Sequence, residues 1–172
     1  MLNILHVLPT IKKGGAEKVV CDLSEITFLN GHKVDILLLN SPEVESFANN
    51  LPDGINIEQI SPYRSKILSY LISVYWLLKN LKTLKQYDII HAHLTFGAVF
   101  STILYVILKL LGNHDVKIFE TYHAVGMPIS KYKRTLSKFL SRFNDCLILM
   151  GEDPYWNSNL SFYPCREVIL IE

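Results

Sequence analysis

The sequence has 172 residues, 49% of them hydrophobic, which fits one domain of ordinary size with a full apolar core. A net charge of +1 gives no general basis for binding nucleic acid or another polyanion. The three cysteines, Cys21, Cys146 and Cys165, are far apart and lack metal-ligand spacing, which favours a reducing, cytoplasmic compartment and argues against a structural zinc site.

The first predicted elements are a strand and a helix joined by a glycine pair. Residues 2–8 are apolar, and Gly14 and Gly15 open a helix that ends near Gly31. Backbone without side chains at a helix N-terminus can approach a ligand closely, and its N–H groups attract phosphate. The pair matches neither the dinucleotide fingerprint nor the Walker loop. Two interpretations stay open: a phosphate-binding loop, or a helix start whose glycines only allow a tight turn.

Strand and helix signals alternate along the rest of the chain. This order predicts an α/β fold with a Rossmann-like, doubly wound and mainly parallel sheet of about seven strands and helices on both faces. The further strands are expected at 33–39, 56–60, 88–91, 116–121, 145–150 and 167–171, and the further helices at about 63–86, 94–111, 129–143 and 153–160. Segment 94–111 approaches membrane-spanning length, but the strands on either side favour a crossover helix. No linker divides the chain, so we expect a single domain over residues 1–172.

Polar residues gather where the predicted strands end. In an open α/β sheet the carboxyl ends of the strands and the loops that follow them form the ligand site. Besides the glycine pair, the residues expected at this edge are His93, Tyr122, His123, Gly126 and Glu152. Because each comes from a different part of the chain, their common location predicts one binding site.

The histidines at this edge allow different roles. His91 and His93 share one face of a strand and could form a metal pair, but no carboxylate or third histidine follows in a recognisable ligand pattern. We therefore interpret His91 as a hydrogen-bonded structural residue and expect His93 to lie further out and line the pocket. His123 precedes small residues, so its ring could bind a sugar hydroxyl or phosphate, or transfer a proton. No Asp-x-Asp pair and no nucleophile motif occurs.

Basic side chains cluster on the predicted helix at 129–143. They lie opposite an apolar stripe, and they are Lys131, Arg134, Lys138 and Arg142. Segment 63–86 also combines basic and aromatic residues without an acid. This pattern suits peripheral contact with anionic lipid headgroups, and it equally suits a solvated outer face.

Taken in order, these motifs resemble the N-terminal half of the family-4 glycosyltransferases, which have the GT-B fold. The resemblance rests on Ile4-Leu5-His6-Val7, Gly14-Gly15-Ala16-Glu17, Asn30-Gly31-His32-Lys33-Val34, Tyr87 to His93, and Thr121-Tyr122-His123. It implies a retaining enzyme with two Rossmann-like domains, a nucleotide-sugar co-substrate and no metal cofactor. It further implies a catalytic-site position for His123, a pocket-lining position for His93, and a close approach of Gly14 and Gly15 to the donor diphosphate or the acceptor.

The resemblance predicts the acceptor-binding domain of a transferase that makes surface polysaccharide or glycolipid. Its acceptor would be lipid-linked or an oligosaccharide, at the cytoplasmic face of the membrane. The sequence ends directly after a predicted strand, so we expect a domain boundary there, with the nucleotide-sugar domain outside this chain and the chain inactive by itself. An alternative is the non-catalytic half of a split two-subunit transferase that binds a partner or a membrane. An oxidoreductase is disfavoured by the missing glycine fingerprint.

Overall fold

The structure is a computed structural model of the whole chain. It describes residues 1–11, 14–40, 47–61, 66–123, 131–151 and 165–171. Gly126, Glu152 and the predicted helix at 153–160 lie outside the described residues.

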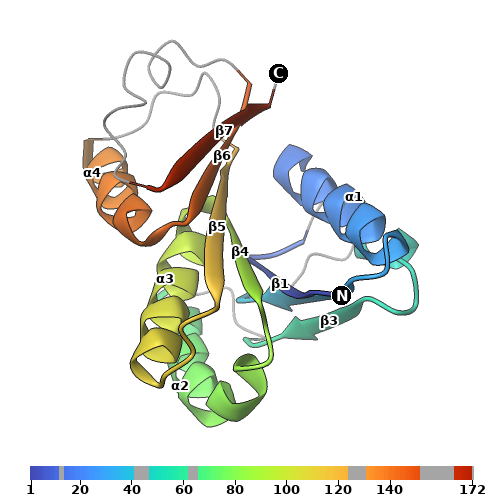
Figure 1. Cartoon of the computed structure of the whole chain (residues 1–172), viewed down its shortest axis with the longest axis horizontal. Coiled ribbons are helices and arrows are strands. Elements are labelled where there is room, and N and C mark those ends of the chain that lie inside the picture. Colours follow the sequence, from blue (N-terminus) through green and yellow to red (C-terminus); the bar gives the residue numbers. More distant parts are fainter. Residues whose placement is uncertain (12–13, 41–46, 62–65, 124–130, 152–164, 172) are drawn as a thin grey trace.

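Seven parallel strands form one twisted sheet in the order β3-β2-β1-β4-β5-β6-β7 (Figure 1). The strands are β1 (Asn3–Leu8), β2 (Lys33–Leu38), β3 (Asn56–Gln59), β4 (Ile89–His93), β5 (Lys117–Tyr122), β6 (Cys146–Met150) and β7 (Glu167–Ile171). The order reverses between β1 and β4, so this junction is the topological switch point, where doubly wound folds place their ligands. The predicted fold class is confirmed.

The helices of the described residues cover both faces of the sheet. They are α1 (Gly15–Leu29), α2 (Lys66–Leu84), α3 (Leu94–Leu110) and α4 (Lys131–Leu140), with short 3₁₀ turns η1 (Phe47–Asn50) and η2 (Ser141–Phe143). Figure 1 shows α1 on one face and α2, α3 and α4 on the other. The apolar segment at 94–111 is the crossover helix α3, as predicted. Within the described residues no helix is both long and apolar enough to span a bilayer.

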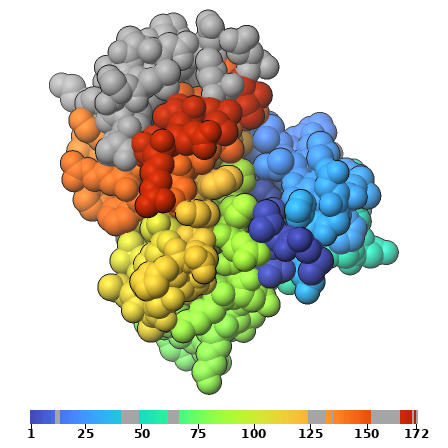
Figure 2. Space-filling view, viewed as in Figure 1, coloured from blue at the N-terminus to red at the C-terminus, as the bar shows by residue number. Residues whose placement is uncertain are grey.

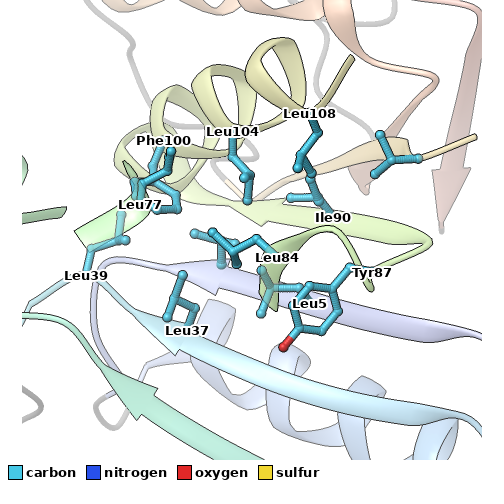
Figure 3. Close-up of a cluster of buried hydrophobic side chains, with 12 residues drawn as sticks. Leu5, Leu37, Leu39, Leu77, Leu84, Tyr87, Ile90, Phe100, Leu104 and Leu108 are labelled. Atoms are coloured by element: carbon cyan, nitrogen blue, oxygen red, sulfur yellow. The ribbon is translucent and has the colours of Figure 1, made fainter. Parts of the chain in front are cut away.

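The alternation of side chains along β1 explains how the core divides between the two faces. Leu5 and Val7 pack against α2 and α3, where Leu77, Phe100 and Leu104 complete a buried cluster (Figure 3). Leu8 packs on the other face with Val20 of α1. His6 lies between Leu5 and Val7 and therefore faces α1.

One glycine fixes how closely α3 approaches the sheet. A Cβ atom on Gly97 would lie 2.6 Å from the carbonyl oxygen of Val7. This oxygen belongs to the backbone, so it cannot rotate away from the clash as a side chain could. The first residue of α3, Leu94, has a positive φ of 61°, which is uncommon for a residue with a side chain. The chain therefore turns from β4 into α3 without an intervening loop.

The space-filling view shows how the first and the last elements of the chain are separated in the molecule. In Figure 2, α1 and β1 (blue) lie at one side, whereas α4 (orange) and β7 (red) lie at the other. Because β1 pairs directly with β4, the switch point lies between these two groups of elements.

Candidate functional site

Three buried histidines meet at the junction of β1 and β4. The strand register places His6 beside His91, and the alternation along β4 places His93 on the same face, toward α1. One ring nitrogen from each residue lies within 4.8 Å of the other two, and all three side chains are buried. The ring centroids of His91 and His93 are 4.2 Å apart. The switch point therefore carries a compact imidazole cluster.

A chain of hydrogen bonds connects this cluster to His123. His6 Nδ1 and His93 Nε2 are 3.0 Å apart and share one proton. His93 Nδ1 and His123 Nε2 are 3.1 Å apart and share another. His123 is only half-buried, so it is the member of the chain nearest to solvent. Which nitrogen of the first ring carries the proton determines the tautomers of the next rings in this hydrogen-bonded series.

His91 is anchored separately, to β5. Its Nε2 lies 2.7 Å from the hydroxyl oxygen of Thr121, and both side chains are buried. The expectation that His91 is hydrogen-bonded is confirmed.

Burial keeps these imidazoles neutral at pH 7. Desolvation lowers the pKa of His6 and the pKa of His123 to about 4. Burial, followed by repulsion from neighbouring imidazoles, holds the pKa values of His91 and His93 well below the ordinary value. A neutral His123 can hydrogen-bond a sugar hydroxyl. Its low pKa makes it a weak base near pH 7, which favours the hydrogen-bonding role over proton transfer.

His93 is not where the sequence predicted it. We expected it further out than His91, but its side chain is fully buried between His6 and His123. The reason is that β4 continues to His93 and α3 begins at the next residue, so no loop carries this side chain toward solvent. A role of His93 in the site, acting through His123, stays a prediction.

His6 is the site residue that the sequence analysis missed. The strand at residues 2–8 was recognised, but only the pairing of β1 with β4 reveals that His6 faces the other histidines. The residues involved are 87 positions apart in the sequence, so no local motif contains them. The inward position of His6 within an apolar strand was the available signal.

Tyr122 lies apart from the histidines. Side chains alternate along β5, so Tyr122 and His123 point to opposite faces of the sheet. Tyr122 packs against Leu147 and Leu149 of β6. Its predicted contact with substrate is not tested by this arrangement and stays a prediction.

The glycine pair has no steric explanation of its own. Gly14 caps α1 with φ −142° and ψ 162°, an extended conformation that any residue adopts. A Cβ on Gly14 would meet the carboxylate of Glu17, which belongs to a flexible side chain, and a Cβ on Gly15 would meet nothing within 4 Å. A tight turn therefore does not require these glycines. The close approach of a ligand to the start of α1 stays a prediction.

The predicted basic and apolar stripes of α4 are described in part. Lys138 is half-buried and Arg142 is exposed, whereas the side chains of Lys131 and Arg134 lie outside the described residues. In the predicted apolar stripe Tyr132 is 75% exposed. A largely apolar groove of about 350 Å³ lies between α3 and α4 and is lined by Val99, Ile103, Val106, Leu136, Phe139 and Phe143, among others. The structure thus leaves part of the stripe without a partner among the described residues.

Comparisons with known proteins identify the family of the chain. The Glycosyltransferase Family 4 model matches residues 13–152. The putative glycosyltransferase EpsD of Bacillus subtilis is 29% identical over 90 residues, which are 49% of this chain and 23% of EpsD.

Similar solved structures are GT-B glycosyltransferases. Anabaena HepE, solved with UDP and glucose, matches with a TM-score of 0.71 and 18% identity over 99% of this chain and 44% of HepE. Sucrose-phosphate synthase of Thermosynechococcus elongatus matches with a TM-score of 0.64 and 16% identity over 99% of this chain and 48% of the synthase. At these identities the structural likeness shows the fold alone. The chain spans less than half the length of each of these three relatives. From the family match over residues 13–152 we conclude that the chain belongs to glycosyltransferase family 4.

Proposed function

We propose that this chain is the acceptor-binding, N-terminal domain of a retaining glycosyltransferase. The enzyme would move a sugar from a nucleotide-sugar to a lipid-linked or oligosaccharide acceptor in the synthesis of a surface polysaccharide or glycolipid. The observation that supports the proposal most directly is the switch point between β1 and β4. It carries both a glycine pair at a helix N-terminus, with open space at Gly15, and a neutral, half-buried His123.

In this proposal the two features contact different parts of the reacting sugars. The backbone of Gly14 and Gly15 approaches the donor diphosphate or the acceptor, because neither residue has a side chain and the space at Gly15 is open. The imidazole of His123 hydrogen-bonds a hydroxyl of the reacting sugar. Gly126 comes after β5 in the sequence and Glu152 comes after β6, and in this proposal both line the pocket. The nucleotide-sugar serves as co-substrate, and no metal ion is required at its diphosphate.

A second domain completes the site in this proposal. HepE has been solved with UDP-glucose, and this chain covers 43% of HepE in that structure. We infer that a C-terminal domain outside this chain binds most of the nucleotide-sugar, so the chain alone is inactive. The protein would work in the cytoplasm, in peripheral contact with the cell membrane.

The test is sugar transfer by a two-domain protein made by joining this chain to the second domain of a family-4 relative such as EpsD. We expect transfer to a glycan or lipid-linked acceptor, and we expect His123→Ala to lower kcat about 100-fold, because it removes a polar contact to the reacting sugar. His114→Ala is the matched control, since His114 is exposed and follows α3. A folded, donor-binding protein that transfers sugar to no acceptor contradicts the proposal, as does full activity of His123→Ala.

Membrane contact is a second function supported by a specific observation, the exposed face of α2. Ile67, Leu71, Tyr75 and Leu78 are each more than half exposed, and their spacing places them on one side of the helix. Lys79, Lys82 and Lys85 follow and are exposed. Apolar side chains flanked by lysines suit insertion into the headgroup layer of an anionic membrane. Such a surface would also serve the non-catalytic half of a split transferase.

A further inference from the structure

We propose that His6, His91 and His93 bind a zinc ion at the junction of β1 and β4, in a site separate from the substrate pocket. The three imidazoles come from two neighbouring strands, face the same way and are buried. Their candidate ligand nitrogens lie within 4.8 Å of one another. A tetrahedral zinc site with Zn–N bonds of about 2.0–2.1 Å separates its nitrogens by roughly 3.4 Å, so small ring rotations are sufficient.

The hydrogen bonds of the cluster indicate which nitrogens would bind the ion. His91 Nε2 is occupied by Thr121, which leaves Nδ1 as its ligand atom. His93 Nδ1 is occupied by His123, which leaves Nε2. His6 Nδ1 already lies 3.0 Å from that His93 nitrogen. A cation between the two replaces the proton that they share, while Thr121 and His123 remain as outer partners that orient the ligands.

The chemistry of the ligand set selects the ion. Three neutral nitrogens suit zinc and similar transition ions, whereas magnesium and calcium require oxygen ligands. Among the described residues, the group of side chains whose candidate ligand atoms lie within 4.8 Å of one another here contains three histidines and no carboxylate. A site of this kind keeps the full charge of the cation. We therefore expect a dissociation constant on the order of micromolar rather than the tighter binding of thiolate sites.

Zinc in this site would determine the tautomer of His123. With His93 Nε2 bound to the ion, the remaining proton of His93 must be on Nδ1, which donates to His123 Nε2. The proton of His123 is then on its own Nδ1. The ion thereby presents His123 as a hydrogen-bond donor to an oxygen atom, without contacting the substrate.

The test is zinc binding by the tag-free chain, measured by equilibrium dialysis and by the visible spectrum of the cobalt-substituted protein. We expect a single zinc ion per chain and a tetrahedral cobalt spectrum. His6→Gln and His91→Gln should each weaken binding at least ~50-fold, since each removes one of three ligands. His114→Gln, at an exposed histidine, should bind zinc as the unchanged chain does. Circular dichroism without zinc identifies any variant that fails to fold.

A second measurement uses the unchanged chain and does not depend on any variant. Long-range ¹H–¹⁵N spectra should show one tautomer of His123, protonated at Nδ1, when zinc is present and a mixture when it is removed. Binding weaker than about 1 mM, or binding that survives both ligand substitutions, would show that the histidines form only a hydrogen-bonded cluster. An unchanged His123 tautomer would overturn the link to the substrate site.

Discussion

Gly15 shows how a single position can be tested for function separately from stability. It is the first residue of α1, and the space that its Cβ would occupy is empty. Alanine also favours the helical conformation by up to about 1 kcal/mol over glycine in a helix interior, and by less at the first position. On steric grounds the residue is therefore replaceable, unless a ligand occupies the space.

We predict that Gly15→Ala leaves the free energy of unfolding unchanged or slightly raised but lowers sugar transfer by the two-domain protein about tenfold or more. The added methyl group would hold the ligand away from the backbone N–H groups at the start of α1. Urea unfolding of the chain and a transfer assay at saturating acceptor measure the two effects. If Gly15→Ala transfers sugar at the original rate and with the original KM, no ligand approaches this residue.

Ionisation of Glu120 makes the free energy of unfolding depend on pH, and a single substitution can separate this effect from those of other groups. Its carboxyl is buried on β5, and desolvation raises its pKa to about 7, against a smaller opposing effect of the hydrogen bond donated by Asn144. Cys165 is the other titratable group coupled to it. Between the unfolded pKa of 4.5 and about 7, the folded state holds a proton that the unfolded state has lost. The free energy of unfolding therefore falls as the pH rises through this range.

We predict that Glu120→Gln removes this loss. Relative to the unchanged protein, the variant should gain about 2 kcal/mol in the free energy of unfolding between about pH 5 and about pH 8, because the amide keeps an acceptor for Asn144 and has no charge to bury. Urea titrations at both pH values measure the difference, and the histidines cancel because both proteins contain them. Glu25→Gln, at an exposed residue of α1, should show no such gain. Equal differences for the two variants would mean that Glu120 is ionised in the folded protein.

At the scale of elements, the contact of α3 with β1 depends on the missing side chain of Gly97. The approach is to the backbone of Val7, which cannot rotate away. We predict that Gly97→Ala lowers the free energy of unfolding by roughly 2 kcal/mol or more, despite the higher helix propensity of alanine. Gly15→Ala is the matched control, because it makes the same chemical change at an open position. If Gly97→Ala is as stable as the unchanged chain, α3 does not pack on β1 at the distance described.

The exposed face of α2 leads to a prediction about membranes. Vesicles containing anionic lipid should sediment the chain, and replacing Leu71 and Tyr75 by Gln should weaken this binding roughly tenfold or more, since each apolar side chain in the headgroup layer contributes about 1–2 kcal/mol. Leu29→Gln is the matched control, because Leu29 is 72% exposed on α1, on the other face of the sheet. Unchanged vesicle binding by the α2 variant would show that this helix is not the membrane-binding surface.

The basic stripe of α4 can be tested by the same vesicle assay. Reversing the charges of Lys131, Arg134, Lys138 and Arg142 should reduce the salt-sensitive part of the binding, because these side chains attract anionic headgroups. Binding that does not respond to this reversal would leave α4 as a solvated outer helix.

At the scale of the whole molecule, the strands and helices could be predicted, whereas their relative placement in the site could not. Segments such as 33–39 and 145–150 are short and apolar, and segment 94–111 is long and apolar between two of them, so local pattern is enough to recognise each element. The predicted helix at 129–143 is α4 followed by a 3₁₀ turn, because helix ends are weakly specified by sequence.

Only those residues of the candidate site that belong to a local sequence motif could be predicted. His123 follows β5 directly, and the glycine pair opens α1 a few residues after β1, so both were recognised. His6 and the burial of His93 depend on the pairing of β1 with β4 and on the absence of a loop before α3. Such features arise from tertiary contacts, which single-sequence patterns do not contain.

The coverage of the relatives predicts what the isolated chain binds. This chain covers 44% of HepE, so we expect the chain to supply only one wall of the substrate cleft. Calorimetric titration of the chain with UDP-glucose should give a dissociation constant weaker than about 1 mM, because one wall supplies few of the donor contacts. The two-domain protein should bind the same nucleotide-sugar measurably more tightly. Tight binding by the chain alone, at about 10 µM or below, would contradict a shared cleft.

The pairing of β1 with β4 also affects when the site forms during folding. Asn3 and Asp88, which are hydrogen-bonded across this junction, are 85 positions apart, and the intervening chain includes β2, β3 and α2. Bringing such distant segments together requires loop closure that local helices do not need, so contacts of this kind tend to form slowly. The imidazoles of His6 and His93 therefore come into contact only after β1 has paired with β4. The NMR resonances of these imidazoles would therefore report when β1 pairs with β4 during refolding.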